Sequence, residues 1–285
     1  MAASVAAASV PCFAAEKRHR FPIVAFSKPF QSLNHEACAD FVTEIGWDGI
    51  ECPVRPKGQI EPETAADELP ALVEALKRRG KTVEIGTTNI TSIDTPHAEK
   101  VLRALAASGV KRYRMGYWKY SEKLSIEKQH AEIRAQIKDL TAMNAELGLR
   151  GGYQNHSGSQ YVGAPIWDMH GILAGMDSAR VGMIFDIGHA TVEGGYSWEI
   201  DARLAGSRLT AVYVKDFQWE RTAKGWKAQW KPLGEGMVNA KYFKMLKATD
   251  YAGPISQHHE YELGSREEMI GAMRADLKVL KGWLA

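Results

Sequence analysis

The sequence predicts a single-domain (β/α)8 barrel of the α/β class. Eight apolar runs of strand length alternate with segments of helical periodicity after residue 20, which is the pattern that an eight-stranded parallel barrel requires. Four of these runs end in polar, ionisable side chains, and the active sites of such barrels lie at one end of the strands. A doubly wound open sheet is the main alternative, but residues 26–30 lack the Gly-rich turn that normally follows its first strand.

The predicted elements follow one another in regular order. Short apolar runs bounded by turn residues predict strands over residues 21–26, 47–51, 81–86, 110–117, 149–154, 181–186, 209–215 and 254–260. Apolar residues at helical spacing predict helices over residues 35–45, 66–79, 96–107, 126–147, 165–176, 197–205, 239–249 and 266–283. Ser32 or Asn34 can cap the first helix, and Gly46 can end it.

Composition narrows the class of protein. Of the 285 residues, 45% are hydrophobic and 25% are charged, which is ordinary for a soluble globular protein. The net charge of +2 is made of interspersed acidic and basic residues, so neither a nucleic-acid partner nor an anionic membrane is expected. The cysteines, Cys12, Cys38 and Cys52, form no CxxC pair, which argues against both a disulfide framework and a zinc–thiolate site. No apolar run reaches the roughly 18 residues of a membrane span.

Two interpretations of the N-terminal segment remain open. Residues 1–15 are alanine-rich and weakly apolar and end in a small-residue pattern, but no basic residue precedes them. Residues 1–20 are therefore either a disordered tail of a cytoplasmic protein or the remnant of an export signal, which would imply a periplasmic or secreted protein. In both cases the barrel domain is expected to cover residues 21–285.

Side chains at the predicted strand ends are the candidates for a functional site. Side chains two residues apart on a strand share a face, so Gln154 can point with His156, and His258 with Glu260. Each candidate also has an ordinary structural explanation, such as a capping aspartate or a core histidine. Their recurrence at four strand ends favours one shared site. The candidates are Glu51, Gln154, His156, Asp186, His189, Lys215, Asp216, His258, His259 and Glu260.

Six short motifs, taken in order, resemble the xylose isomerase-like TIM barrels. They are IGWDGIE at strand two, YQNHSG at strand five, FDIGHA at strand six, YVKDF at strand seven, PLGEG in the following loop and HHEY at strand eight. The resemblance covers nearly the whole chain after residue 20. This family includes isomerases and epimerases of sugars and sugar phosphates, inosose dehydratases and endonuclease IV.

The resemblance implies a divalent cation held by a glutamate, an aspartate, a histidine and a second glutamate on strands five to eight. The two glutamates of the family exchange the proton of a sugar carbon. Asp186 and Glu260 match this pattern, and His189 is similar to the family's substrate-binding histidine. Gln154 stands where the first glutamate is expected, and Tyr213 where the histidine is expected.

These two departures change the expected chemistry. A glutamine amide can ligate a cation through its oxygen, but it brings no charge and cannot act as a general base. A divalent metal (Zn, Mn or Mg) is therefore expected to be weakly held or absent, with Asp186, Glu260 and Gln154 as the remaining ligands. Alternatively, the site works without a metal and uses histidine together with Lys215, whose pKa burial could lower.

The expected function is isomerisation or epimerisation of a sugar or keto-sugar through proton abstraction next to a carbonyl and an enediolate. A lyase or dehydratase on a keto-sugar or cyclitol is the alternative enzyme, and a non-catalytic carbohydrate-binding barrel is the alternative from another class. The residues expected to be catalytic are Glu260, His189 and Lys215. Those expected to bind the carbohydrate substrate are Glu51, His156, Trp219 and His258.

Residues 218–238 form a long segment rich in tryptophan and basic residues. Trp219, Trp226 and Trp230 could belong to a lid that stacks on a sugar, or to a β-hairpin that covers the barrel or contacts another subunit of a homo-oligomer. Such interleaving also suits single-stranded nucleic acid, but the resemblance implies that endonuclease chemistry needs further histidines on strands two and three, and these are missing. Residues 234–236 could bind a phosphate, although Glu235 disfavours it and a plain turn is expected.

Overall fold

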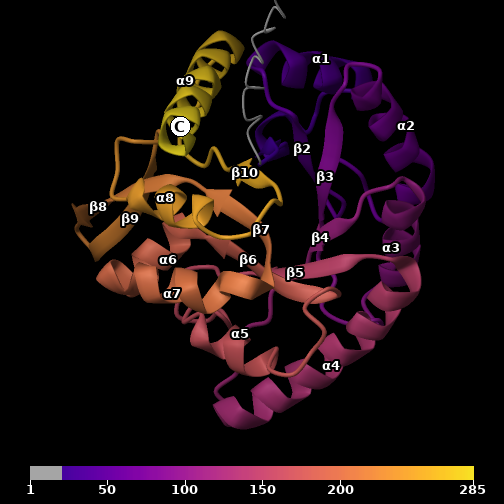
Figure 1. Ribbon diagram of the computed structural model, residues 1–285, viewed down its shortest axis with the longest axis vertical. Coiled ribbons are helices and arrows are strands. Elements are labelled where there is room, and N and C mark those ends of the chain that lie inside the picture. The colour runs from indigo at the N-terminus through magenta and orange to yellow at the C-terminus, as the bar shows by residue number, and fades with distance from the viewer. Residues whose placement is uncertain (1–20) are drawn as a thin grey trace, which may run out of the picture.

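The eight predicted strands close into a parallel barrel in the computed structural model, which describes residues 21–285 (Figure 1). The tail or export signal expected for residues 1–20 lies outside the described residues. The strands are hydrogen-bonded in the closed order β1-β10-β7-β6-β5-β4-β3-β2, so the predicted (β/α)8 fold is confirmed. The barrel strands are β1 (Ile23–Phe26), β2 (Gly49–Pro53), β3 (Thr82–Thr87), β4 (Arg112–Arg114), β5 (Arg150–Gln154), β6 (Val181–Asp186), β7 (Leu209–Val214) and β10 (Ile255–Gln257).

An outer ring of helices covers the barrel (Figure 1). None of the helices in residues 21–285 is long and apolar enough to cross a membrane. The α-helices are α1 (His35–Ile45), α2 (Ala65–Lys77), α3 (Ala98–Ala107), α4 (Ile126–Leu147), α5 (Trp167–Ile172), α6 (Ile187–Gly194), α7 (Trp198–Ala205), α8 (Lys241–Lys247) and α9 (Arg266–Leu284). Short 3-10 helices are η1 (Lys28–Phe30), η2 (Gly195–Ser197) and η3 (Gly206–Arg208).

Helix α1 shows why the local predictions hold. Asn34, rather than Ser32, caps it, because its Oδ1 accepts a hydrogen bond of 2.9 Å from the backbone N–H of Ala37. Gly46 ends it in the left-handed region at φ 97°, a conformation that glycine adopts without steric cost. The bounds of α1 and α4 coincide with the predicted helices 35–45 and 126–147.

The predictions differ from the structure at several strand and helix ends. Strand β4 covers only part of the predicted 110–117, because beyond it the N–H of Gly116 bonds to Ile90 in a loop. Strand β10 ends at Gln257, before the predicted end at residue 260. Helix α6 was not predicted. Gly188 within it is needed for a close approach, because a Cβ there would lie 2.8 Å from the backbone oxygen of Lys215.

The barrel interior consists of an apolar layer beneath a polar one. Ile85, Ile184, Ala211 and Tyr213 form a separate buried cluster. Interior side chains alternate along each strand, so Asp186, two residues after Ile184, begins the polar layer at the carboxyl end of the barrel. Tyr213, which replaces the histidine that the resemblance implied, packs in the apolar cluster although its Cα is paired with that of Asp186.

The long segment after β7 is an antiparallel hairpin of β8 (Asp216–Thr222) and β9 (Gly225–Lys231). This outcome confirms the hairpin interpretation of residues 218–238. Phe217 pairs with Trp230 and Trp219 with Ala228, which places these four side chains on one face of the hairpin. Trp230 lies nearest the barrel mouth, with its ring 4.6 Å from Lys215 Nζ.

Asp216 holds the loop that returns from the hairpin. Its carboxylate accepts hydrogen bonds of 2.9–3.1 Å from the backbone N–H groups of Phe217, Gly234, Gly236 and Val238. A Cβ at Gly236 would lie 2.2 Å from Asp216 Oδ1, so only glycine fits this turn. The candidate site residue Asp216 is therefore structural, and the amides of Gly234 and Gly236 are not free to bind a phosphate.

Candidate active site

A cavity of about 150 Å³ lies at the carboxyl end of the barrel strands. This is the end at which barrel enzymes place their catalytic residues, whereas the opposite end usually serves stability. A larger cavity of about 640 Å³ lies at that opposite end, next to Arg112, Arg150 and Leu209 at the starts of their strands. The smaller cavity is therefore the candidate active site. Its lining residues are Phe26, Lys28, Glu51, Arg55, Arg114, Tyr117, Gln154, His156, Lys215, His258 and Glu260.

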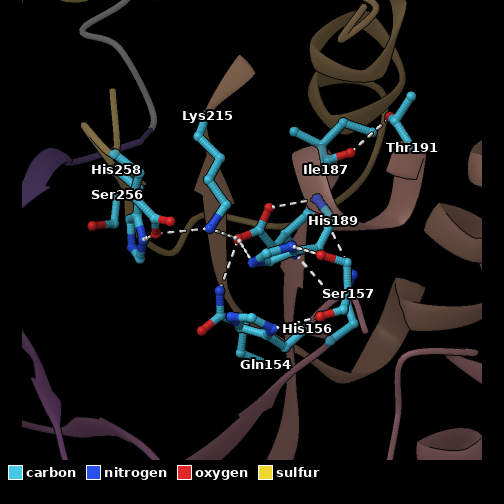
Figure 2. Close-up of polar contacts among 12 residues, drawn as sticks. Gln154, His156, Ser157, Ile187, His189, Thr191, Lys215, Ser256 and His258 are labelled. Atoms are coloured by element: carbon cyan, nitrogen blue, oxygen red, sulfur yellow. Dashed lines mark hydrogen bonds and ion pairs between the residues drawn. The ribbon is translucent and has the colours of Figure 1, made fainter. Parts of the chain in front are cut away.

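Lys215 is the centre of the site. Its side chain follows β7, is only 2% exposed, and extends toward Gln154 and His189 in Figure 2. Its Nζ donates a hydrogen bond of 2.9 Å to Glu260 Oε1 and lies 3.3 Å from Asp186 Oδ2. Two carboxylates from β6 and from the loop after β10 thus share one ammonium group.

The pKa values of these groups follow from the shared charge. Burial opposes ionisation of Lys215, but Asp186 and Glu260 outweigh it and raise the pKa of the ammonium. The expectation that burial lowers this pKa was wrong, because the carboxylates come from strands distant in sequence. Burial likewise opposes ionisation of both carboxyl groups, but Lys215 is the largest opposing influence and lowers the pKa of each. All three groups are charged at neutral pH.

Gln154 completes this cluster as a hydrogen-bond donor. Its Nε2 donates to Asp186 Oδ2 at 2.7 Å, and its Oε1 accepts a hydrogen bond from the Tyr117 hydroxyl. Because an ionised carboxylate can only accept, the amide NH₂ must face Asp186. The amide oxygen, which is the only atom of Gln154 that could bind a cation, is turned to Tyr117.

The residues present do not fit the divalent cation that the family resemblance implied. The three expected ligands, Asp186, Glu260 and Gln154, do meet in space, but the first two face the Lys215 ammonium and the third presents its NH₂. Tyr213 is buried on β7 in register with Asp186, and its ring centroid lies 4.3 Å from that of His258. Among residues 21–285, no group of three or more His, Cys, Asp and Glu side chains could hold a metal ion. These side chains suit the ammonium group of Lys215 better than a bound metal ion.

Glu51 and His258 form a second charged pair in the cavity. Glu51 Oε2 lies 2.9 Å from His258 Nε2 and accepts a hydrogen bond of 2.7 Å from Ser256. Burial opposes charging of the imidazole, but Glu51 and then Glu260 outweigh it and raise the pKa of His258. Burial also opposes charging of Glu51, and His258 outweighs it, so that the pKa of Glu51 is lowered. Glu51 and Glu260 thus favour the imidazolium form of His258, which can donate a proton.

His156 differs from His258 in charge. Its Nδ1 lies 2.9 Å from the backbone oxygen of Ser157, and since a carbonyl only accepts, Nδ1 carries the proton. Burial and the nearby Lys215 lower the pKa of His156, so the ring is neutral at pH 7 and its Nε2 can accept a proton. His156 comes from the end of β5, and its ring centroid lies 4.0 Å from that of His189 (Figure 2).

The structure places the predicted site residues at three depths. Glu51, Gln154, His156, Lys215, His258 and Glu260 line the cavity. Asp186 and His189 are buried behind the lining, where His189 Nδ1 lies 2.7 Å from Ser157 Oγ. Trp219 lies on β8 outside the lining and is 40% exposed, and His259 is buried 3.5 Å from Asp276.

Sequence reasoning missed five lining residues, Phe26, Lys28, Arg55, Arg114 and Tyr117, and named Trp230 only as one of three tryptophans of the hairpin. Arg114 ends β4, and Arg55 follows Glu51 by four positions, so the strand-end rule could have found both if it had been applied to the second and fourth strands. Trp230 could be distinguished from the other hairpin tryptophans only through the pairing register of β8 and β9. It is Trp230, and not Trp219, that the hairpin brings to Lys215.

Comparisons with known proteins identify the family. A family model described as xylose isomerase-like TIM barrel matches residues 39–282. The chain belongs to this family. A search of curated proteins found no match to it.

Several solved structures have a similar fold at low sequence identity. The 3-keto-D-glucoside 4-epimerase YcjR from E. coli is 16% identical, with a TM-score of 0.67 over 92% of this chain and 99% of that chain. The probable 3-DHS dehydratase AsbF from Bacillus anthracis is 16% identical, with a TM-score of 0.68 over 92% of this chain and 98% of that chain. A xylose isomerase-like TIM barrel protein from Mycobacterium smegmatis, in complex with magnesium, is 17% identical. Its TM-score is 0.67 over 94% of this chain and 99% of that chain. These similarities establish the fold, and the chemistry has to be derived from the residues of this chain.

Proposed function

We propose that the protein is an isomerase or epimerase of a sugar or keto-sugar, which acts by removing a proton next to a carbonyl group. The observation that carries the proposal is the Lys215 ammonium, held in the cavity 2.9 Å from the Glu260 carboxylate. A cation beside a carboxylate suits this reaction, because the cation stabilises the oxygen on which negative charge develops while the carboxylate takes the proton. The epimerase and the dehydratase among the similar structures support this class of chemistry.

Lys215 has the donor capacity that this role requires. An ammonium group has three N–H donors, and two of them are directed to Asp186 and Glu260. The third can bind a substrate carbonyl oxygen, with the Trp230 ring at 4.6 Å beside it. Because the carboxylates raise the pKa of Lys215, the group stays charged and stabilises the enediolate electrostatically without giving up its proton.

Glu260 is the proposed base. Its side chain is 31% exposed, so substrate can reach it. In the first step the C–H proton moves to the carboxylate, the C–H electron pair forms the C=C bond, and the carbonyl π pair moves to the oxygen held by Lys215. A substrate oxygen that competes for the ammonium also weakens the Lys215–Glu260 contact, which makes Glu260 a stronger base when substrate is bound.

The enediolate then regains the proton. Return from Glu260 to the neighbouring carbon, with transfer of a hydroxyl proton between the two oxygens, gives the isomer. His156 can carry that second proton, because its Nε2 is unprotonated and the ring lines the cavity. Transfer of a proton from a second acid, such as the cavity-lining His258, to the opposite face of the original carbon gives the epimer. Glu260 then releases its proton to solvent, and His258 regains one.

A dehydratase is the second candidate, and the state of His258 favours it. Glu51 and Glu260 raise the pKa of His258 and so favour its protonated form, and the ring lines the same cavity as Lys215. An enediolate that carries a hydroxyl on the next carbon can expel it as water if an acid protonates it. Accumulation of a dehydrated product, rather than of an isomer, would decide for this reaction.

Deuterium exchange tests the proposed function directly. The protein is incubated in D₂O with a panel of ketoses, keto-glycosides and keto-acids of sugars, and each compound is analysed by NMR. We expect deuterium at a carbon next to the carbonyl of at least one compound, with no exchange by Glu260→Gln and normal exchange by the surface control Glu220→Gln. If the wild-type protein binds a carbohydrate but exchanges no proton in the whole panel, the non-catalytic binding barrel replaces this proposal.

A further inference from the structure

Two arginines in the cavity form no salt bridge with a carboxylate among residues 21–285. Arg55 is partly buried, and its guanidinium lies 5.7 Å from the ring centroid of Phe26. Arg114 is 3% exposed and lies 4.5 Å from the ring centroid of Tyr117. Burial and the neighbouring Arg114 lower the pKa of Arg55, which shows that the two cations are close enough to repel each other.

The carboxylates of the cavity compensate these arginines only in part. Lys215 faces both Asp186 and Glu260, and His258 faces Glu51, which also acts on Arg55 at longer range. With His258 protonated, Arg55 and Arg114 leave an excess of one positive charge, to which the exposed Lys28 adds. Burying charge without a counter-ion is unfavourable. Such an excess persists in a cavity only if a ligand or ordered solvent compensates it.

Arg114 also has an unused donor. Its Nη2 donates to the backbone oxygen of Thr88 at 3.3 Å, but its Nη1 is buried without a hydrogen-bond partner among the described residues. A buried donor without a partner costs on the order of 1–3 kcal/mol. A ligand oxygen in the cavity would satisfy it.

We propose that Arg55 and Arg114 bind a carboxylate of the substrate, so that the substrate is a sugar acid rather than a neutral sugar. This proposal rests on the proposed function, which places the reacting carbonyl group of the substrate at Lys215 and Glu260. The guanidinium group is planar and offers paired donors that match the two oxygens of a carboxylate. Phosphate groups are usually held by backbone amides at helix N-termini or in glycine-rich turns, and the amides of Gly234 and Gly236 are already bonded to Asp216.

The barrel topology places the two ends of this substrate on opposite sides of the cavity. Arg55 follows β2 and Arg114 ends β4, and these strands flank β3 in the closed strand order. Strand β7, which presents Lys215, lies directly across the ring of eight from β3. The carboxylate and the reacting carbonyl are therefore at opposite ends of one small substrate, consistent with a cavity of about 150 Å³.

Calorimetric binding of matched charged and neutral probes tests this proposal without requiring turnover. The probes are D-gluconate against D-sorbitol, D-galacturonate against D-galactose, and D-glucose 6-phosphate against D-glucose. The variants are Arg55→Gln and Arg114→Lys, with Arg203→Gln on the exposed face of α7 as the control of equal charge change. Arg114→Lys keeps the charge but removes the paired donors, and thermal melting checks the fold of every variant.

We expect a carboxylate probe to bind more tightly than its neutral partner. Arg55→Gln should weaken that binding about 10- to 100-fold, as the loss of charge-assisted hydrogen bonds predicts, while Arg203→Gln and the neutral probes should show no change. Arg55 makes no side-chain hydrogen bond to residues 21–285, so Arg55→Gln carries the test alone if Arg114→Lys fails to fold.

Three results would overturn the proposal: equal affinity for charged and neutral probes, carboxylate binding unaffected by Arg55→Gln, or a sugar phosphate bound more tightly than both sugar acids. Failure of this proposal can be distinguished from failure of the proposed function, because one experiment measures binding and the other measures proton exchange. If carboxylate probes bind through Arg55 but no compound exchanges a proton in D₂O, the anion site stands and the isomerase proposal fails.

Discussion

Replacing Lys215 by methionine is expected to have the largest effect of any single substitution, on both stability and turnover. Among residues 21–285, Lys215 is the only lysine or arginine within 4 Å of the buried Asp186, and the nearby His189 is neutral. Removing one partner of a buried ion pair typically costs about 3–5 kcal/mol, because the remaining charge stays buried without compensation. Loss of the group that stabilises the enediolate should also lower kcat by roughly 10²–10³-fold.

A matched lysine separates these effects from a general loss of charge. Lys231 on β9 pairs with Glu220 at 2.8 Å, but both side chains are partly exposed, so Lys231→Met should cost no more than about 1 kcal/mol. Urea unfolding and initial rates measure both variants. The double variant Lys215→Met/Asp186→Asn should recover part of the lost stability and none of the activity. A Lys215→Met protein with the stability and kcat of the wild type would refute the role of this ammonium.

Glu260→Gln is expected to abolish turnover while leaving the fold intact. Glutamine keeps the shape of the side chain and can still accept a hydrogen bond from Lys215, but it cannot take up a proton. General bases usually contribute about 10²–10⁴-fold to the rate, so kcat should fall by that factor. Thermal melting, initial rates and the surface control Glu220→Gln complete the experiment. A variant that retains more than about a tenth of the wild-type kcat would show that another group, with His156 as the first candidate, is the base.

Most of the fold could be predicted because the signals are local. Apolar periodicity located all eight strands, and the Asn34 cap with Gly46 located α1 to the residue. Helix α6 was missed because a glycine such as Gly188 is unfavourable inside a helix. Gly188 is needed there because the backbone of Lys215 approaches it closely, and a contact between segments distant in sequence is not visible in a local pattern.

The site could be predicted only in part, for a related reason. The strand-end rule found the side chains that meet at Lys215, but it could not show how they are paired. Burial alone lowers the pKa of Lys215, and the net shift is upward because of Asp186 and Glu260. The barrel brings these carboxylates to within 3.3 Å and 2.9 Å of the ammonium from distant positions in the chain. The arginines were missed because Arg55 lies beyond the end of β2 and Arg114 ends β4, outside the motifs that resemble the family.

The departures from the family pattern are consistent with one another in the structure. Gln154 presents an NH₂ to Asp186, Tyr213 joins the apolar layer, and Lys215 supplies a positive charge between the two carboxylates that the family resemblance assigned to a cation. The central claim is that this ammonium performs the electrostatic role in catalysis.

Proton exchange by chelated protein tests that claim most directly. The protein is dialysed against EDTA, its metal content is measured, and its exchange rate in D₂O is compared with and without added Mn²⁺, Mg²⁺ or Zn²⁺. We predict that the exchange rate survives chelation and rises less than about twofold on addition of any of the three ions. The double variant Gln154→Glu/Tyr213→His should bind Mn²⁺ more tightly than the wild type, because it restores charged and imidazole donors. Loss of exchange on chelation of the wild-type protein, with recovery on stoichiometric Mn²⁺ or Mg²⁺, would contradict the claim.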